Sequence, residues 1–302
     1  MPVDNVSSAL LYQSTIGYSV GVQDQIVKID QQLSSGAKSQ DFKGLNGQVD
    51  AYVSMQNDLT AAATYTTVNS QVSARLNTTS QALGQMITIA GNAKNLMLQA
   101  RNTSTSASLA FDQQMMGYFQ QIAGQFNGVD GNGNSLFGGT QTDRPPIDPT
   151  VYPSNTVTGT PDANYYKGNS GTITATIADN QNITTNVPGN DQGFQQIFAA
   201  FDMAKKAFDS GDNTMMGNAE AMMQSGVARI TTVQTTIDAN AAQVQQEQSI
   251  SDAHTTYLKG LNINGADIVA LSTQLATYQG ILQASFQAFA SLQKLGLSQY
   301  LA

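Results

Sequence analysis

Cysteine and tryptophan are both absent from this chain of 302 residues, and histidine occurs once, at His254. Without cysteine there can be no disulfide framework, no thiolate metal ligand and no cysteine nucleophile. A lone histidine cannot provide the ligands of a zinc site, and imidazole catalysis needs an oriented partner. The sequence therefore predicts no cofactor and no metal site.

Charged residues are also few. Charged residues make up 11% of the chain, whereas soluble domains average roughly 25%. Glutamate occurs only at Glu220 and Glu247. The net charge of -8 leaves no basic surface for phosphates, which argues against a nucleic-acid partner. The longest apolar runs are too short for a membrane helix, so we expect no membrane insertion.

Apolar residues recur at alternating steps of three and four in both terminal thirds of the chain, which is the heptad pattern of packed helices. The pattern predicts a helix that ends near Leu33 and a long helix from about 49 to 101. It predicts further helices over 111–126, from 192 onward, and on both sides of a break near Gly260. Long helices of this kind commonly bury such faces against other subunits. The predicted assembly seam comprises Val72, Leu76, Leu83, Met86, Met97, Ile230, Val233, Ile237, Val244, Ile268, Leu271, Leu275, Tyr278, Leu282, Phe289 and Leu292.

The middle of the chain follows a period of two, and six of the seven prolines lie near it. Alternation of hydroxyl and apolar residues over 172–177 predicts a strand, and residues 183–187 form the expected returning strand after a turn at 179–181. The predicted fold class is mainly α, with long antiparallel terminal coiled-coil helices and a small central β subdomain. The expected divisions are an N-terminal helical arm over 1–130, the β subdomain over 131–190 and a C-terminal helical arm over 191–302.

Two motifs suggest chemistry and fail on inspection. Ser35 and Lys38 have the S-x-x-K spacing of penicillin-recognising hydrolases, but the serine should begin a helix and here ends one. Asp130 begins a stretch like a calcium loop, yet Ser135 stands where glycine is required and Gln141 stands where glutamate is required. The sequence therefore predicts no catalytic residue, and we expect that the chain is not an enzyme.

Several segments resemble one protein family. They are Leu33–Gly36 (LSSG), Leu96–Asn102, Asn134–Thr140 with Thr142–Ile147 behind it, and Leu295–Leu301. Together they resemble the bacterial flagellin family, which includes filament flagellin and the related hook-filament junction protein. The segments from Asn134 onward are most similar to the junction branch.

The resemblance implies a structural subunit that is exported unfolded by the flagellar type III apparatus and polymerises helically outside the cell, in the flagellum, for swimming motility. Its implied partners are copies of itself and other flagellar axial proteins, and an export chaperone is compatible with it. The alternative is a helical interaction module of another secretion or signalling assembly, which would share the heptads without needing the LSSG and C-terminal segments.

Overall fold

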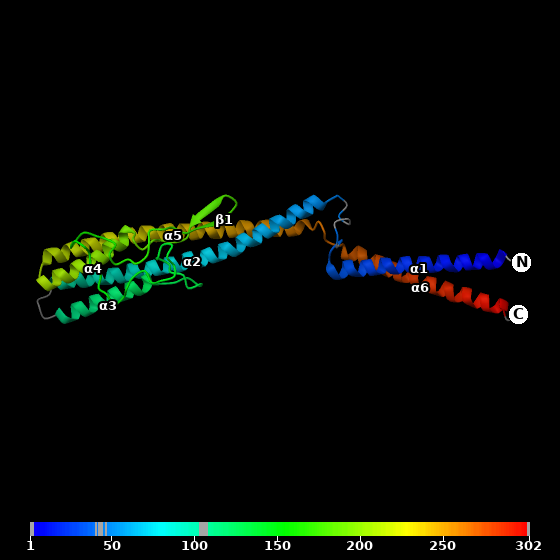
Figure 1. Cartoon of the computed structure of the whole chain (residues 1–302), viewed down its shortest axis with the longest axis horizontal. Coiled ribbons are helices and arrows are strands. Elements are labelled where there is room, and N and C mark those ends of the chain that lie inside the picture. Colours follow the sequence, from blue (N-terminus) through cyan, green and yellow to red (C-terminus); the bar gives the residue numbers. More distant parts are fainter. Residues whose placement is uncertain (1–2, 40, 42–44, 46, 103–107, 301–302) are drawn as a thin grey trace. The chain divides into compact units, whose positions relative to one another are not determined.

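The computed structural model describes residues 3–39, 41, 45, 47–102 and 108–300. Helix dominates this part of the chain, and one antiparallel hairpin interrupts it (Figure 1). The elements in order are α1 (Val3–Ser35), α2 (Val49–Asn102), α3 (Ser108–Phe126), β1 (Thr174–Ala178), β2 (Gln181–Thr184), α4 (Gln192–Ser210), α5 (Asn213–Leu261) and α6 (Ile268–Tyr300).

The chain forms two compact units. One unit combines the two ends of the chain, residues 1–60 and 256–302, and the other comprises residues 61–255. The fold class expected from the sequence is confirmed, since the molecule is mainly helical with a small β part. The division into segments 1–130, 131–190 and 191–302 stays a prediction.

In the first unit, α1 and α6 lie side by side and run in opposite directions (Figure 1). Gly36 ends α1 with a φ of 66°, a left-handed conformation that glycine adopts without steric cost. Beyond this cap, Ala37 pairs with Gly265 ahead of α6. Asn264 fixes the same junction, because its side chain both accepts from the Ser39 N–H and donates to the Ser39 carbonyl.

In the second unit, α3, α4 and the long loop between them enclose an aromatic core. Phe126 at the end of α3 stacks on Phe137 of the loop, with ring centroids 5.4 Å apart. It also meets Phe194 and Phe198 of α4 edge-on, at 4.8 Å and 5.7 Å. Burial of several large rings in one place supplies most of the hydrophobic stabilisation that a small subdomain can collect.

The start of α4 is fixed by two charges. Asp191 caps the helix, since its carboxylate accepts a hydrogen bond from the Gly193 N–H at 2.8 Å. Arg229 of α5 binds the same carboxylate through two nitrogens, at 3.2 Å and 2.8 Å. At the other end, Gly211 caps α4 in the left-handed conformation. Asp191 at the start of α4 therefore both caps this helix and joins it to α5 through Arg229.

The predicted hairpin is present, but its strands begin and end at other residues than predicted. Asn180 adopts a φ of 58° in a turn that places Gln181 already in β2. The ladder ends before residues 172 and 173 because the Ile173 N–H donates to the side chain of Asn186 at 2.7 Å instead of to a strand. Ile177 and Ile183 are buried as alternation predicts. Side-chain hydrogen bonds of this kind leave no periodic signal in a sequence.

Candidate assembly surfaces

The predicted seam divides between two structural environments. Its nine members on α2 and α5 are all buried in the 61–255 unit, the most exposed being Val233 at 9%. These two helices run antiparallel, since Gln234 donates to the Ser80 carbonyl at 3.2 Å and Arg101 pairs with Glu220 at 2.9 Å. This half of the seam therefore packs the chain against itself.

The α6 members of the seam lie in the other unit. Leu271, Leu275, Tyr278, Leu282 and Phe289 are half-buried, whereas Ile268 is 48% exposed. The side chain of Leu292 lies outside the described residues. On the partner helix α1 the covered positions, which show the same spacing, are Ser19, Val22, Ile26, Ile29 and Leu33. The two stripes form the contact between α1 and α6.

Two helices alone cannot cover all their apolar residues. On α1, Tyr18 and Val27 are 60% and 53% exposed, and on α6 Val269 and Phe286 are 78% and 54% exposed. Ile16 and Val20 are also exposed on α1. Exposed apolar side chains on both helices of one pair are therefore not covered by the pair itself. The first unit therefore carries apolar surface that its own helices leave open.

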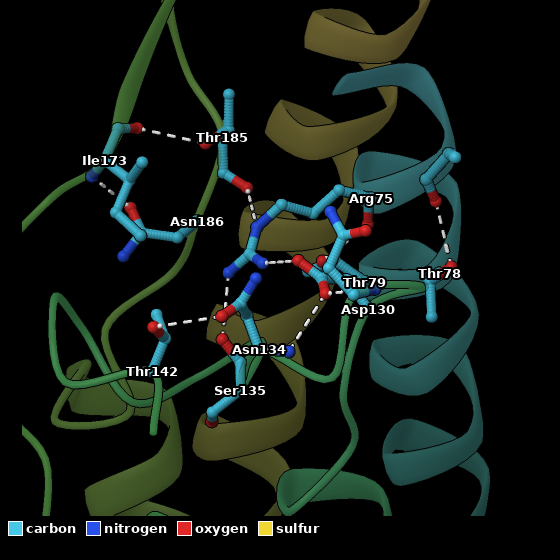
Figure 2. A network of polar contacts seen from close by, with 12 residues as sticks. Arg75, Thr78, Thr79, Asp130, Asn134, Ser135, Thr142, Ile173, Thr185 and Asn186 are labelled. Carbon is cyan, nitrogen blue, oxygen red and sulfur yellow. Dashed lines mark hydrogen bonds and ion pairs between the residues drawn. The ribbon is translucent and has the colours of Figure 1, made fainter. Parts of the chain in front are cut away.

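A second feature is a polar clasp that attaches the loop and hairpin to α2 (Figure 2). The guanidinium of Arg75 donates to the Asp130 carboxylate, to the Ser135 carbonyl at 2.9 Å and to the Thr185 carbonyl at 3.3 Å. The Arg75 and Asp130 side chains are 11% and 10% exposed. Asp130 also accepts from the backbone N–H groups of Asn132 and Asn134. One arginine thus joins a helix to two separate segments of the central subdomain.

Asn186 extends this network deeper into the subdomain. Its amide nitrogen donates to the carbonyls of Gly139 and Gly171, at 3.1 Å and 3.2 Å, and its oxygen accepts from Ile173. The side chain is 3% exposed, so these bonds satisfy a buried amide fully. Motif analysis missed both Arg75 and Asn186. The only available signal was that Arg75 is the one charged residue between Ala61 and Ala93.

The clasp predicts a dependence of stability on pH. Burial raises the pKa of Asp130, but hydrogen bonds from Asn134, Asn132 and Arg75 outweigh it and hold the pKa below its ordinary value of 3.8. A lowered folded-state pKa contributes stability above the unfolded-state pKa, and this contribution is lost as pH falls through the folded value.

We therefore expect the difference in unfolding free energy between the wild type and Asp130→Asn to be constant from about pH 5 to 7, above the ordinary carboxyl pKa, and to shrink below about pH 4. Urea unfolding at a series of pH values measures this difference. A difference at pH 3 as large as that at pH 7 would contradict the assignment.

The other residues considered for catalysis or metal binding are Ser35, His254 and the calcium-like stretch that begins at Asp130. Ser35 lies in the last turn of α1, where its hydroxyl accepts from the Ala37 N–H at 3.3 Å. His254 is exposed on α5. The calcium-like stretch is a tight turn closed on Asp130. Among the described residues, no group of three or more His, Asp or Glu side chains could hold a metal ion. In the same part of the chain, no helix combines the length and apolar character needed to span a membrane.

Comparison with known proteins places these surfaces in context. The family model of the bacterial flagellin N-terminal helical region matches residues 6–142. These residues form a flagellin-type N-terminal helical region. The resemblance to the flagellin family expected from the LSSG segment and from Leu96–Asn102 is thereby confirmed within the matched region. Because flagellin-type proteins are structural, the expectation that the chain is not an enzyme holds.

Solved structures share the fold of this chain. Bacillus cereus FlgL aligns over 69% of this chain and 98% of its own length, with 15% identity and a TM-score of 0.58. Flagellar hook associated protein-3 of Legionella pneumophila aligns over 68% and 98%, with 11% identity and a TM-score of 0.52. A protein of Vibrio parahaemolyticus described as flagellar hook-associated covers 72% of this chain and 96% of its own, with 15% identity and a TM-score of 0.56. No curated protein matches the chain in sequence.

Proposed function

We propose that this chain is a self-assembling subunit of the flagellar axial filament, either filament flagellin or the hook-filament junction type. In this proposal it leaves the cell unfolded through the type III export apparatus, polymerises helically outside, and serves swimming motility. The flagellin-type region supports the proposal at the level of family. The observation that carries it is the open apolar surface of α1 and α6, which an isolated subunit would leave exposed to water.

The proposal gives the terminal helices the central part in assembly. Paired as a coiled coil, α1 and α6 would present Tyr18, Val27, Val269 and Phe286 to neighbouring copies. Low charge suits such a lattice, because every charge on a subunit recurs at each neighbour and like charges brought close without water repel. The lack of cysteine suits passage of an unfolded chain to an oxidising exterior.

The α6 part of the predicted seam provides the test. We expect Leu275→Asp or Leu282→Asp to raise the concentration needed for polymerisation by more than about tenfold, because about 1.4 kcal/mol of lost contact free energy already gives that factor and a carboxylate placed in a half-buried seam loses hydration. Electron microscopy and sedimentation of full-length protein with seed filaments measure the effect.

Two matched variants separate assembly from folding. Leu282→Met keeps an apolar side chain of similar volume and should polymerise like the wild type. Val151→Asp makes the same apolar-to-acid change at a loop position of the 61–255 unit where the native side chain is 61% exposed, and should also polymerise. Filaments from either α6 aspartate variant at wild-type concentration would refute the seam assignment. A wild type that neither polymerises nor localises to flagella would refute the proposed function.

Immunogold labelling of flagella distinguishes the two kinds of subunit. A filament flagellin should be labelled along the whole filament, whereas a junction protein should be labelled only at the hook end. The similarity of residues 134–147 to the junction branch favours the second pattern.

A further inference from the structure

Asparagine followed directly by glycine occurs four times in the chain, at Asn46, Asn127, Asn132 and Asn264. Asparagine is one of the thermolabile residues of proteins. Its side-chain carbonyl carbon can be attacked by the backbone nitrogen of the next residue, and glycine hinders that attack least because it has no Cβ. Asn46 lies outside the described residues. The other three pairs can be compared in the structure.

The attacking nitrogen makes the same hydrogen bond in all three pairs. Each glycine N–H donates to the carbonyl three residues earlier: Gly128 to Gln125 at 3.0 Å, Gly133 to Asp130 at 2.9 Å and Gly265 to Asn262 at 3.0 Å. This bond therefore slows the attack in each pair alike. We expect differences in reactivity to come from the asparagine side chains and their exposure.

Two of the three asparagine side chains are held in place. Asn127 donates to the Ile147 carbonyl at 3.0 Å and accepts from the Ile147 N–H at 3.1 Å. Asn264 makes the equivalent two hydrogen bonds with Ser39, both at 3.0 Å. Both asparagines are half-buried. Their side chains cannot turn toward the glycine nitrogen until these bonds break.

The side chain of Asn132 differs in both respects. It is exposed, as are Gly131 and Gly133 on either side of it, and it makes no hydrogen bond to any residue that the structure describes. The backbone N–H of Asn132 donates to the Asp130 carboxylate at 2.9 Å. The side chain is therefore free to turn while the backbone around it belongs to the clasp.

We propose that Asn132 is the site of a spontaneous modification that loosens the clasp between Arg75 and Asp130. The Gly133 nitrogen, after losing its proton to solvent, attacks the side-chain carbonyl carbon of Asn132. The bond from this carbon to the amide nitrogen breaks, and that nitrogen takes a proton and leaves as ammonia. Water then opens the resulting cyclic imide at either carbonyl, which gives aspartate or isoaspartate at position 132. Water is the only co-reactant, and the reaction needs only the folded monomer, so it is independent of assembly.

The modification acts on the clasp through the turn that holds Asp130 (Figure 2). One carboxylate oxygen of Asp130 accepts from the backbone N–H groups of Asn132 and Asn134, at 2.9 Å and 3.0 Å, while Arg75 binds the carboxylate from α2. Isoaspartate lengthens the main chain by a methylene group between these two N–H groups, so they no longer converge on one oxygen. Either product also places a negative charge near Asp130, which disfavours its ionised form.

Peptide mass spectrometry of the full-length protein measures the reaction at each site. Incubation in heavy-oxygen water at mildly alkaline pH marks every opened imide, because the oxygen that enters comes from the solvent. We expect Asn132 to react at least about tenfold faster than Asn127 or Asn264 in the folded protein, a ratio that one or two additional hydrogen bonds to break would produce. In the denatured protein the three rates should become similar, since all three pairs are Asn-Gly.

A variant that cannot react tests the effect on the clasp. Asn132→Ser keeps a polar residue that turns accept, but it cannot form the imide. After incubation we expect the 61–255 unit of the wild type to unfold at a lower urea concentration than before, while Asn132→Ser keeps its midpoint. In Arg75→Ala the clasp is already open, so incubation should shift the midpoint much less.

Equal rates at Asn132 and Asn127 in the folded protein would overturn the assignment of the site. An unmodified Asn132 after an incubation that modifies the denatured chain would overturn it as well. If the wild type becomes largely modified and still unfolds at the same urea concentration as incubated Asn132→Ser, the link to the clasp is wrong.

Discussion

Truncating Phe126 to alanine is expected to lower the unfolding free energy of the 61–255 unit by about 3–5 kcal/mol, the usual cost of emptying a large aromatic site in a core. Phe126 is fully buried and touches Phe137, Phe194 and Phe198. These rings come from the loop and from α4, so the cavity would lie where three segments meet. Urea unfolding followed by near-ultraviolet circular dichroism, which reports aromatic packing, measures the loss.

Two variants calibrate this result. Phe126→Leu keeps most of the apolar volume and should cost clearly less than the alanine variant. Phe286→Ala removes a phenylalanine that is 54% exposed on α6, and should change the unfolding free energy of the 61–255 unit by less than about 0.5 kcal/mol. A loss below about 1 kcal/mol for Phe126→Ala, the scale of an average point mutation, would mean that the site refills by rearrangement.

The helices could be predicted because their signal is long and periodic. Heptad spacing located both ends of α2 and the end of α5 to within a residue or two, and Gly36 marked the end of α1 as expected. The break between α4 and α5 was not predicted. The seam residues of these helices are buried where the spacing places them inward. What spacing cannot distinguish is whether an inward face meets the same chain or another copy, since both coverings select the same apolar residues.

The central subdomain was harder to predict, for a physical reason. Its order depends on single polar side chains such as Asn186 and Arg75, which bind backbone groups far away in sequence. Such contacts have no period and depend on the path of the loop, which only the folded chain defines. The strand β1 begins later than predicted for the same reason. The Ile173 N–H donates to the Asn186 side chain and not to the neighbouring strand, as a longer ladder would require.

Replacing Arg75 by alanine should destabilise the 61–255 unit by about 3–5 kcal/mol, because removal of one partner leaves the other buried charge without compensation. Asp130 would keep its backbone hydrogen bonds but lose its counter-charge, and the carbonyls of Ser135 and Thr185 would lose a donor. Hydrogen exchange should show the effect first in the hairpin and the 130–142 loop, with α3 and α4 better protected. Arg75→Lys should give an intermediate loss, since an ammonium cannot reproduce three directed guanidinium bonds.

The comparison with an exposed ion pair separates the clasp from a general effect of charge. Arg144 and Asp143 pair at 3.4 Å with side chains 56% and 73% exposed, and such pairs contribute roughly 0–1 kcal/mol. Arg144→Ala should therefore leave the unfolding free energy nearly unchanged.

In the double variant Arg75→Ala with Asp130→Ala the uncompensated carboxylate is gone, so the total loss of unfolding free energy should fall well short of the sum of the two single losses. Additive losses would show that Arg75 stabilises the unit through its packing and its two carbonyl bonds, and that its charge contributes little.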